Sequence, residues 1–268
     1  MPIEVVRARP DGARRPVSLV FVHGIIAGAW IWQEHFLPYF VDCGYPVYAV
    51  NLRGHGKSEG REQLVSAGLA DFTADLNSAL DGLDLEPDDS IVLVGFSMGG
   101  AVVQNYLRTG GSASGMVLLS SVPPYGLARA NFELAMRDPV LWAELAKLAE
   151  RGLEAVDPQL IRKALFSDIS DAGYDAFLAK ADPMSLRISW DMQGFPPIAP
   201  LPVNAPPTYV LGGSLDKMVP MTDCLMTAAY FGAPVKVIAG AAHTLMLEPQ
   251  WREVADSIQE WLVHRFPG

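Results

Sequence analysis

Cysteine is scarce in this sequence, with only Cys43 and Cys224 among 268 residues. Two cysteines cannot form the disulfide framework of a small secreted domain. Both lie among apolar residues, so we expect buried free thiols. Cysteine and histidine do not gather at the spacing of a zinc site, and no metal centre is expected. The sequence also has no internal repeat and no low-complexity tract.

Basic residues are also in the minority. Twenty Lys and Arg stand against 30 Asp and Glu, a formal net charge of −10. Nucleic acids and anionic membranes attract basic surfaces, so this balance argues against either as the main partner. The acidity is concentrated in residues 59–90, which hold nine acidic residues and one basic residue, Arg61. We expect this segment to be a solvated face that serves solubility.

No apolar run is long enough to span a membrane. Residues 14–29 imitate a signal peptide, because two arginines precede apolar and small residues. Pro16 and the pair His23-Gly24 interrupt the stretch, which is better explained as a buried strand followed by a glycine-containing loop. We therefore expect no targeting segment and a cytoplasmic protein.

Half of the residues are apolar, which is enough for a large hydrophobic core. Short, uniformly apolar segments alternate with helical patterns, as is typical of an α/β protein with a mostly parallel, doubly wound sheet covered on both faces. The strands are predicted at 3–9, 17–22, 46–51, 91–96, 116–120, 208–211 and 235–238, and the helices at 30–43, 68–80, 97–108, 222–231 and 248–266.

The alternation stops between residues 125 and 202. Only helical patterns occur there, at 130–137, 139–151, 158–166, 172–180 and 185–191, and a proline-rich run at 195–202 follows them. We predict that residues 125–202 form a helical cap over one end of the sheet. Residues 1–124 and 203–268 would form the core.

The sharpest signal is a Gly-x-Ser-x-Gly pattern from Gly95 to Gly99, centred on Ser97. It follows the apolar segment 91–96 directly and opens the next predicted helix. A turn this tight strains the serine backbone, and the glycines leave room for it. The hydroxyl then stands clear of the sheet at a helix N-terminus, where the N–H of Met98 can face a developing oxyanion. The alternative is an ordinary strand-to-helix turn that contains a serine.

A serine hydroxyl needs a base, and five histidines are available. We select His243, because its loop follows the last predicted strand at the sheet edge where α/β proteins bind ligands. His23 also ends a strand, and we interpret it as orienting its loop. The third member should be a carboxylate at a strand end, which Asp216 supplies. Asp223 competes with it but lies inside the next helix, where an acid complements the helix dipole.

The chain order Ser97, Asp216, His243 and its surroundings resemble the α/β-hydrolase fold superfamily over nearly the whole chain. The resemblance is carried by His23-Gly24 after the third strand, residues 51–58 (Asn-Leu-Arg-Gly-His-Gly-Lys-Ser) after the fourth, the motif at 95–100, Asp216 with Val219-Pro220, and the run Gly-Ala-Ala-His243. In that family the second oxyanion donor is the N–H of the residue after the His-Gly pair, which implies Ile25 here. The resemblance also implies a cap inserted after the sixth strand, and chemistry without a metal or an organic cofactor.

The mechanism implied by the resemblance is acyl transfer to water. His243, held by Asp216, takes the Ser97 proton as the oxygen attacks a carbonyl. Serine as nucleophile argues against haloalkane dehalogenases and epoxide hydrolases, which resemble this fold but carry aspartate. Relatives of dienelactone hydrolase carry cysteine and are equally disfavoured.

The residues around the predicted triad are strongly apolar, so we expect a hydrophobic pocket. Its predicted lining is Ile26, Trp30, Met218, Val219, Leu245 and Met246. These features favour a carboxylesterase or lipase-like enzyme for small to medium apolar esters, with a lactonase next. Thioesterase, C–C hydrolase, lyase and perhydrolase chemistry stay open, as does a non-catalytic relative that binds a ligand. The oligomeric state is not predicted.

Overall fold

One sheet organises the protein. The structure, a computed structural model, describes residues 1–86, 88–194 and 205–267. Its seven strands follow the order β1-β3-β2-β4-β5-β6-β7, and all neighbours run parallel except β1, which is antiparallel to β3. The bounds are β1 Val5–Ala8, β2 Val17–Val22, β3 Val47–Val50, β4 Ser90–Phe96, β5 Gly115–Leu119, β6 Thr208–Gly213 and β7 Val235–Ile238. The predicted mostly parallel α/β sheet is confirmed.

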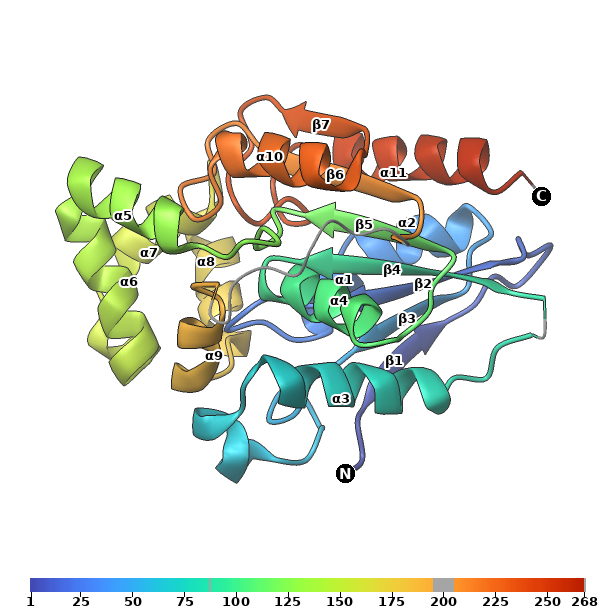
Figure 1. The fold of residues 1–268 in the computed structure, drawn as a ribbon, viewed down its shortest axis with the longest axis horizontal. Helices are drawn as coiled ribbons and strands as arrows, with labels where there is room; N and C mark the ends of the chain where they lie inside the picture. Colours follow the sequence, from blue (N-terminus) through green and yellow to red (C-terminus); the bar gives the residue numbers. More distant parts are fainter. Residues whose placement is uncertain (87, 195–204, 268) are drawn as a thin grey trace.

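Helices cover both faces of the sheet (Figure 1). One face carries α3 (Leu69–Asp81), α4 (Met98–Arg108) and α10 (Met221–Phe231), and the other carries α1 (Trp30–Gln33), α2 (Phe36–Asp42) and α11 (Trp251–Arg265). Because side chains alternate along a strand, β2 sends Leu19 and Phe21 into one hydrophobic cluster and Val20 and Val22 into the other. The sequence of a strand that is buried on both faces is therefore a continuous run of apolar residues.

The helix predicted at 30–43 is divided into α1 and α2, and that prediction is wrong in this respect. The chain leaves the helical path at His35, whose backbone has φ −127° and ψ −52°. In a continuous helix the ring of Pro38 would clash with the carbonyl of Glu34, and its missing N–H would leave that carbonyl unpaired. Starting α2 at Phe36 places Pro38 in the first turn, where neither effect arises.

Further helices follow β5 in the described part of residues 125–202. They are α5 (Ala128–Arg137), α6 (Pro139–Arg151), α7 (Pro158–Leu165), α8 (Asp171–Lys180) and α9 (Leu186–Asp191), here called the inserted helices. They gather beyond the carboxyl ends of the parallel strands (Figure 1). The resemblance counts the strand before His23-Gly24 as the third and therefore places the insertion after the sixth strand. In this chain that strand is β2, since only β1 precedes it, and the insertion follows the fifth strand, β5. The proline-rich run 195–202 and the predicted boundary at 202/203 lie outside the described residues.

Local signals in the sequence begin four of the inserted helices. Asp138, Asp157, Ser170 and Ser185 each accept a hydrogen bond from a backbone N–H in the first turn of α6, α7, α8 and α9, respectively. Pro139 and Pro158 occupy the first turn of α6 and α7, where proline is favoured. These signals explain why the predicted helix starts are close to those observed.

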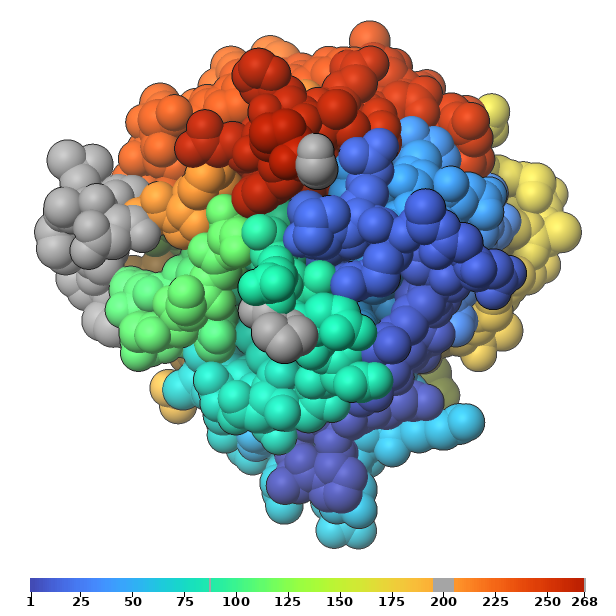
Figure 2. Space-filling view, turned by 90° about the vertical axis from the view of Figure 1, so that its right-hand side faces the viewer, coloured from blue at the N-terminus to red at the C-terminus, as the bar shows by residue number. Residues whose placement is uncertain are grey.

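The acidic segment 59–90 ends in a loop that leads into the amino end of β4, opposite Ser97. Figure 2 looks onto this face, where residues 81–86 and 88–90 lie beside the N-terminal segment. Arginines neutralise part of the charge: Arg53 binds Asp71 and Asp75 at 2.9 Å each, Arg9 binds Asp84 at 3.1 Å, and Arg14 binds Asp89.

Both cysteines are free thiols. Cys224 is buried, and burial raises the pKa of its thiol to about 12. Cys43 is only half-buried, contrary to expectation, because it ends the short helix α2 near the surface. Among the described residues, no helix is long and apolar enough to cross a membrane.

Candidate active site

Ser97 occupies the sharp turn between β4 and α4. Its backbone has φ 52° and ψ −119°, a strained conformation for a residue with a side chain. The flanking glycines make this turn possible. A Cβ on Gly99 would lie 2.2 Å from the carbonyl oxygen of Val22, and one on Gly95 would lie 2.6 Å from the Cα of Gly100. The turn presents the Ser97 side chain at the N-terminus of α4.

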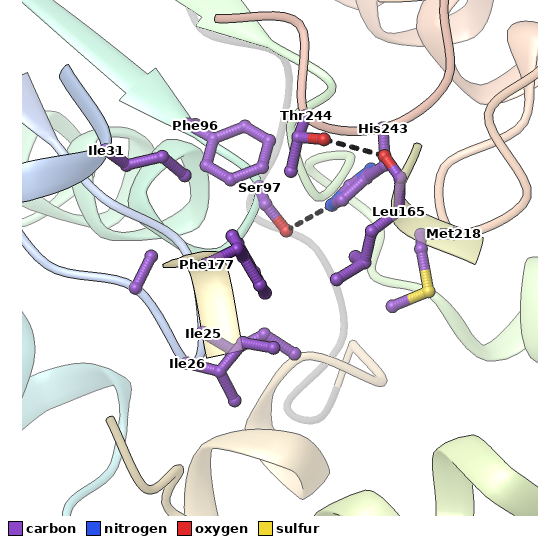
Figure 3. A pocket seen from close by; sticks show the side chains of 11 residues that line it. Ile25, Ile26, Ile31, Phe96, Ser97, Leu165, Phe177, Met218, His243 and Thr244 are labelled. Atoms are coloured by element: carbon purple, nitrogen blue, oxygen red, sulfur yellow. Dashed lines mark hydrogen bonds between the residues drawn. The ribbon is translucent and has the colours of Figure 1, made fainter. Parts of the chain in front are cut away.

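Ser97, His243 and Asp216 form a chain of hydrogen bonds. His243 Nε2 lies 3.0 Å from Ser97 Oγ, and His243 Nδ1 lies 2.9 Å from Asp216 Oδ2 (Figure 3 shows the first contact). A carboxylate can only accept, so Nδ1 carries the imidazole proton and Nε2 of the neutral ring accepts from the serine hydroxyl. All three side chains are buried. This is the arrangement in which a histidine can withdraw a proton from a serine.

The carboxylate of Asp216 is itself fixed. Its Oδ1 accepts the backbone N–H groups of Met218 at 2.8 Å and Val219 at 2.9 Å, which leaves Oδ2 for His243. Asp223, the competing acid, is fully buried elsewhere and accepts hydrogen bonds from Tyr125 and Arg129, both at 2.6 Å. Burial and this carboxylate raise the pKa of Tyr125 above its ordinary value.

His23 has both ring nitrogens engaged away from Ser97. Its Nε2 accepts the N–H of Leu52 at 3.1 Å, so its Nδ1–H donates to the carbonyl oxygen of Gly24 at 2.8 Å. Complete burial and the neighbouring His55 ring, 4.7 Å away, hold the pKa of His23 well below its usual range. A neutral His23 thus holds its own loop, as predicted, and also links it to the loop after β3, which was not predicted.

The loop after β2 lies directly against Ser97. A Cβ on Gly24 would lie 3.1 Å from Cβ of Ser97, so the next residue, Ile25, follows immediately beside it. The N–H groups of Ile25 and Met98 donate no hydrogen bond to any other described residue. Ile26 then adopts φ 52°, one of three positive values at non-glycine residues in the described chain.

A hollow of about 290 Å³, including its mouth, opens beside Ser97 and His243. It is lined by Ile25, Ile26, Ala27, Ile31, Phe96, Ser97, Leu165, Phe177, Met218, His243 and Thr244. Of the described residues that line it, only Ser97, His243 and Thr244 are polar, and Thr244 Oγ1 already donates to the carbonyl oxygen of Leu165 at 2.7 Å. The described part of the hollow therefore offers an apolar surface around the Ser97 hydroxyl (Figure 3).

Of the six predicted pocket residues, Ile26 and Met218 line this hollow. Trp30 is not among the described lining residues, and its ring packs edge-on against that of Phe177, with 5.5 Å between the ring centroids. Val219 is buried beside Asp216, and Leu245 and Met246 belong to the core cluster around α11. After His243 the chain turns, with the N–H of Leu245 on the carbonyl of His243, and this turn directs the following side chains into the core.

The inserted helices supply two lining residues that the sequence did not reveal, Leu165 at the end of α7 and Phe177 on α8. No motif marks either residue, and each is far from Ser97 along the chain. Within the described residues, no group of three or more His, Cys, Asp or Glu side chains could hold a metal ion.

The chain is similar to known proteins in both sequence and fold. A family model described as "Alpha/beta hydrolase family" matches residues 19–257. The chain is 28% identical to a monoacylglycerol lipase of Mycolicibacterium smegmatis, over 95% of this chain and 90% of that protein. It is 33% identical to a non-heme chloroperoxidase of Streptomyces lividans, over 42% of this chain and only 40% of that protein. A lipase-esterase related protein of Clostridium acetobutylicum shares the fold, with a TM-score of 0.74, 18% identity, and coverage of 96% and 98% of the two chains.

Proposed function

The chain belongs to the alpha/beta hydrolase family, and we propose that it is a serine hydrolase that cleaves small to medium apolar carboxylic esters through an acyl-enzyme. One observation carries the proposal: Ser97, His243 and Asp216 are joined by hydrogen bonds of 3.0 and 2.9 Å at the edge of an apolar hollow. Ser97 is the nucleophile, His243 the general base and Asp216 the group that fixes the imidazole.

In the first half-reaction, the Oγ of Ser97 forms a bond to the ester carbonyl carbon while Nε2 of His243 takes the hydroxyl proton. The carbonyl oxygen becomes an oxyanion between the N–H groups of Ile25 and Met98, and each donor contributes about 3 kcal/mol to the barrier reduction. Met98 begins α4, so the helix dipole adds to this stabilisation. The intermediate collapses, and His243 returns the proton to the leaving alcohol.

In the second half-reaction, His243 removes a proton from water, and the hydroxide attacks the acyl carbonyl. The carboxylic acid leaves, and Ser97 regains its proton. Each attack on a carbonyl needs a neutral imidazole protonated at Nδ1, which the carboxylate of Asp216 favours, and each collapse uses the proton that Nε2 has taken up. We further propose that residues 125–202 act as a cap over a core of residues 1–124 and 203–268, because Leu165 and Phe177 help to line the hollow.

The substrate class follows from the lining. Among the described residues around the hollow, none is Arg or Lys, so nothing there would bind a substrate carboxylate or phosphate. Aliphatic and aromatic walls favour the acyl or alkyl chain of an ester. The monoacylglycerol lipase relative supports an ester over other carbonyl compounds. Lactones, thioesters and diketones cleaved at a C–C bond would react with the same three residues, Ser97, His243 and Asp216.

A second candidate is acyl transfer to hydrogen peroxide. The acyl-enzyme would pass its acyl group to peroxide, giving a peracid and free Ser97. The similarity to non-heme chloroperoxidase favours this candidate. That similarity extends over only 42% of the chain. Adding hydrogen peroxide to the ester assay and measuring peracid formation tests it.

The test of the main proposal is hydrolysis of a chromogenic short-chain ester by wild type, Ser97→Ala and Ser112→Ala. Ser112 is exposed in the loop after α4, and its hydroxyl has no role in the proposal, so it serves as the control. We expect Ser97→Ala to abolish turnover while Ser112→Ala matches wild type. Full esterase activity of the Ser97→Ala variant would contradict the proposal.

A further inference from the structure

The segment that leaves α8 returns to the core at Asp182. The backbone N–H of Asp182 donates to the carbonyl oxygen of Ile26 at 3.1 Å. Its carboxylate accepts the N–H of Gly56 at 3.3 Å through Oδ2 and a guanidinium N–H of Arg61 at 2.8 Å through Oδ1. The Asp182 side chain is 15% exposed. One residue of the insertion thus contacts both the loop after β2 and the loop after β3.

The loop that Asp182 contacts is in an unfavourable conformation. Ile26 is β-branched and has φ 52°, which such residues rarely adopt, so its surroundings must hold it in place. On one side, Asn51 Oδ1 accepts the N–H of Ala29 at 2.7 Å. On the other side, α8 packs against the loop, with Phe177 5.5 Å and the Lys180 ammonium 5.8 Å from the ring of Trp30. Asp182 fastens the same loop through the carbonyl of Ile26.

The N–H of Ile25 belongs to the peptide between Gly24 and Ile25, which lies beside Ser97, and the peptide between Ile25 and Ile26 follows it. A change of Ile26 toward ordinary backbone angles would displace Ile25 through the peptide that joins them, and this displacement would move the Ile25 N–H away from the position of the oxyanion. We propose that Asp182 is a positioning residue that keeps the Ile25 N–H aimed at the reacting carbonyl. This inference rests on the proposed function, and it means that the insertion supports the oxyanion hole as well as the pocket.

The carboxylate is the part of Asp182 that a substitution can remove. Without its bonds to Gly56 and Arg61, residue 182 is anchored only by its backbone, and the hydrogen bond to Ile26 loses its support. Complete loss of one oxyanion donor lowers kcat by about 10² to 10³. A misaligned donor should cost less, and we expect Asp182→Ala to lower kcat about 10- to 100-fold with little change in KM.

Two variants and one inhibitor test this inference. Asp182→Ala is compared with Asp171→Ala, which removes the exposed carboxylate that pairs with Arg162 on the same inserted helices and does not touch the loop. A trifluoromethyl ketone with an apolar tail adds Ser97 Oγ to its carbonyl and places an oxyanion at the proposed site. We expect its affinity to fall for Asp182→Ala by a factor similar to the fall in kcat, and to be unchanged for Asp171→Ala.

Asp182→Asn keeps the size and one acceptor oxygen, and it guards against a folding failure of the alanine variant. Its kcat and inhibitor affinity should lie between those of wild type and Asp182→Ala. Equal kcat and inhibitor affinity in all variants would overturn the inference, and so would a change in KM alone. If wild type shows no hydrolysis that depends on Ser97, the proposed function fails and the inference fails with it. Hydrolysis that depends on Ser97 but ignores Asp182 overturns the inference only.

Discussion

Asparagine in place of Asp216 should disable the enzyme by changing the position of one proton. Oδ1 of Asp216 accepts two backbone N–H groups, from Met218 and Val219. An asparagine must keep its carbonyl oxygen at that position, because its NH₂ group cannot accept those bonds. The NH₂ group then faces Nδ1 of His243 and requires that nitrogen to be unprotonated. The imidazole proton moves to Nε2, where it points at Ser97 and blocks proton removal.

The wrong tautomer should lower kcat by about 10⁴, which corresponds to about 5.5 kcal/mol of activation free energy. The assay is hydrolysis of a chromogenic short-chain ester at saturating concentration, with circular dichroism to confirm the folded state. Asp223→Asn is the matched control. It weakens a buried contact with Arg129 and Tyr125, so its melting temperature should fall while its kcat stays within about threefold of wild type. A kcat for Asp216→Asn within tenfold of wild type, or an equal loss in Asp223→Asn, would refute the reasoning.

Two further predictions concern the pocket and its attachment. Phe177→Leu should enlarge the hollow and raise kcat/KM for octanoate relative to butanoate esters by about fivefold or more, whereas Phe132→Leu, at an exposed position on α5, should leave the ratio unchanged. An unchanged ratio in Phe177→Leu would show that Phe177 does not limit the acyl chain. Glu248 is buried and accepts hydrogen bonds from the N–H and hydroxyl of Ser167, and burial raises the pKa of its carboxyl. The folded state then holds the proton more tightly than the unfolded state, so this stabilisation is present below the ordinary glutamate pKa and is lost as pH rises through the raised pKa. Glu248→Gln should therefore gain stability relative to wild type between pH 4 and pH 7 in urea unfolding, and a difference that does not grow with pH would contradict the burial effect.

The close arrangement of Ser97, Asp216 and His243 could be predicted because each residue has a local signal. Glycines flank Ser97 where a Cβ would collide with backbone: the collision at Gly95 is with the neighbouring Gly100, and the collision at Gly99 is with the carbonyl oxygen of Val22 at the end of β2. Asp216 and His243 each follow an apolar strand, and parallel strands bring their carboxyl ends to the same edge of the sheet. Strand burial on both faces also produced the apolar runs from which the sheet was predicted.

The pocket wall could not be predicted in the same way. Phe177 and Leu165 line it because α7 and α8 pack over the sheet edge, and no spacing in the sequence encodes that contact. Leu245 and Met246 were predicted to line the pocket because they follow His243, but the turn at Thr244 sends them into the core. Residues that are adjacent in sequence to a site residue line the same pocket only when the backbone does not turn between them.

The central claim is that Ser97 is the nucleophile, and covalent labelling tests it most directly. The protein is treated with a fluorophosphonate, digested with trypsin and analysed by mass spectrometry, with residues 62–108 expected as the peptide that carries Ser97. We predict one adduct per chain, located on Ser97, and none in Ser97→Ala. An adduct on another residue, or ester hydrolysis that continues with Ser97 unlabelled, would contradict the account.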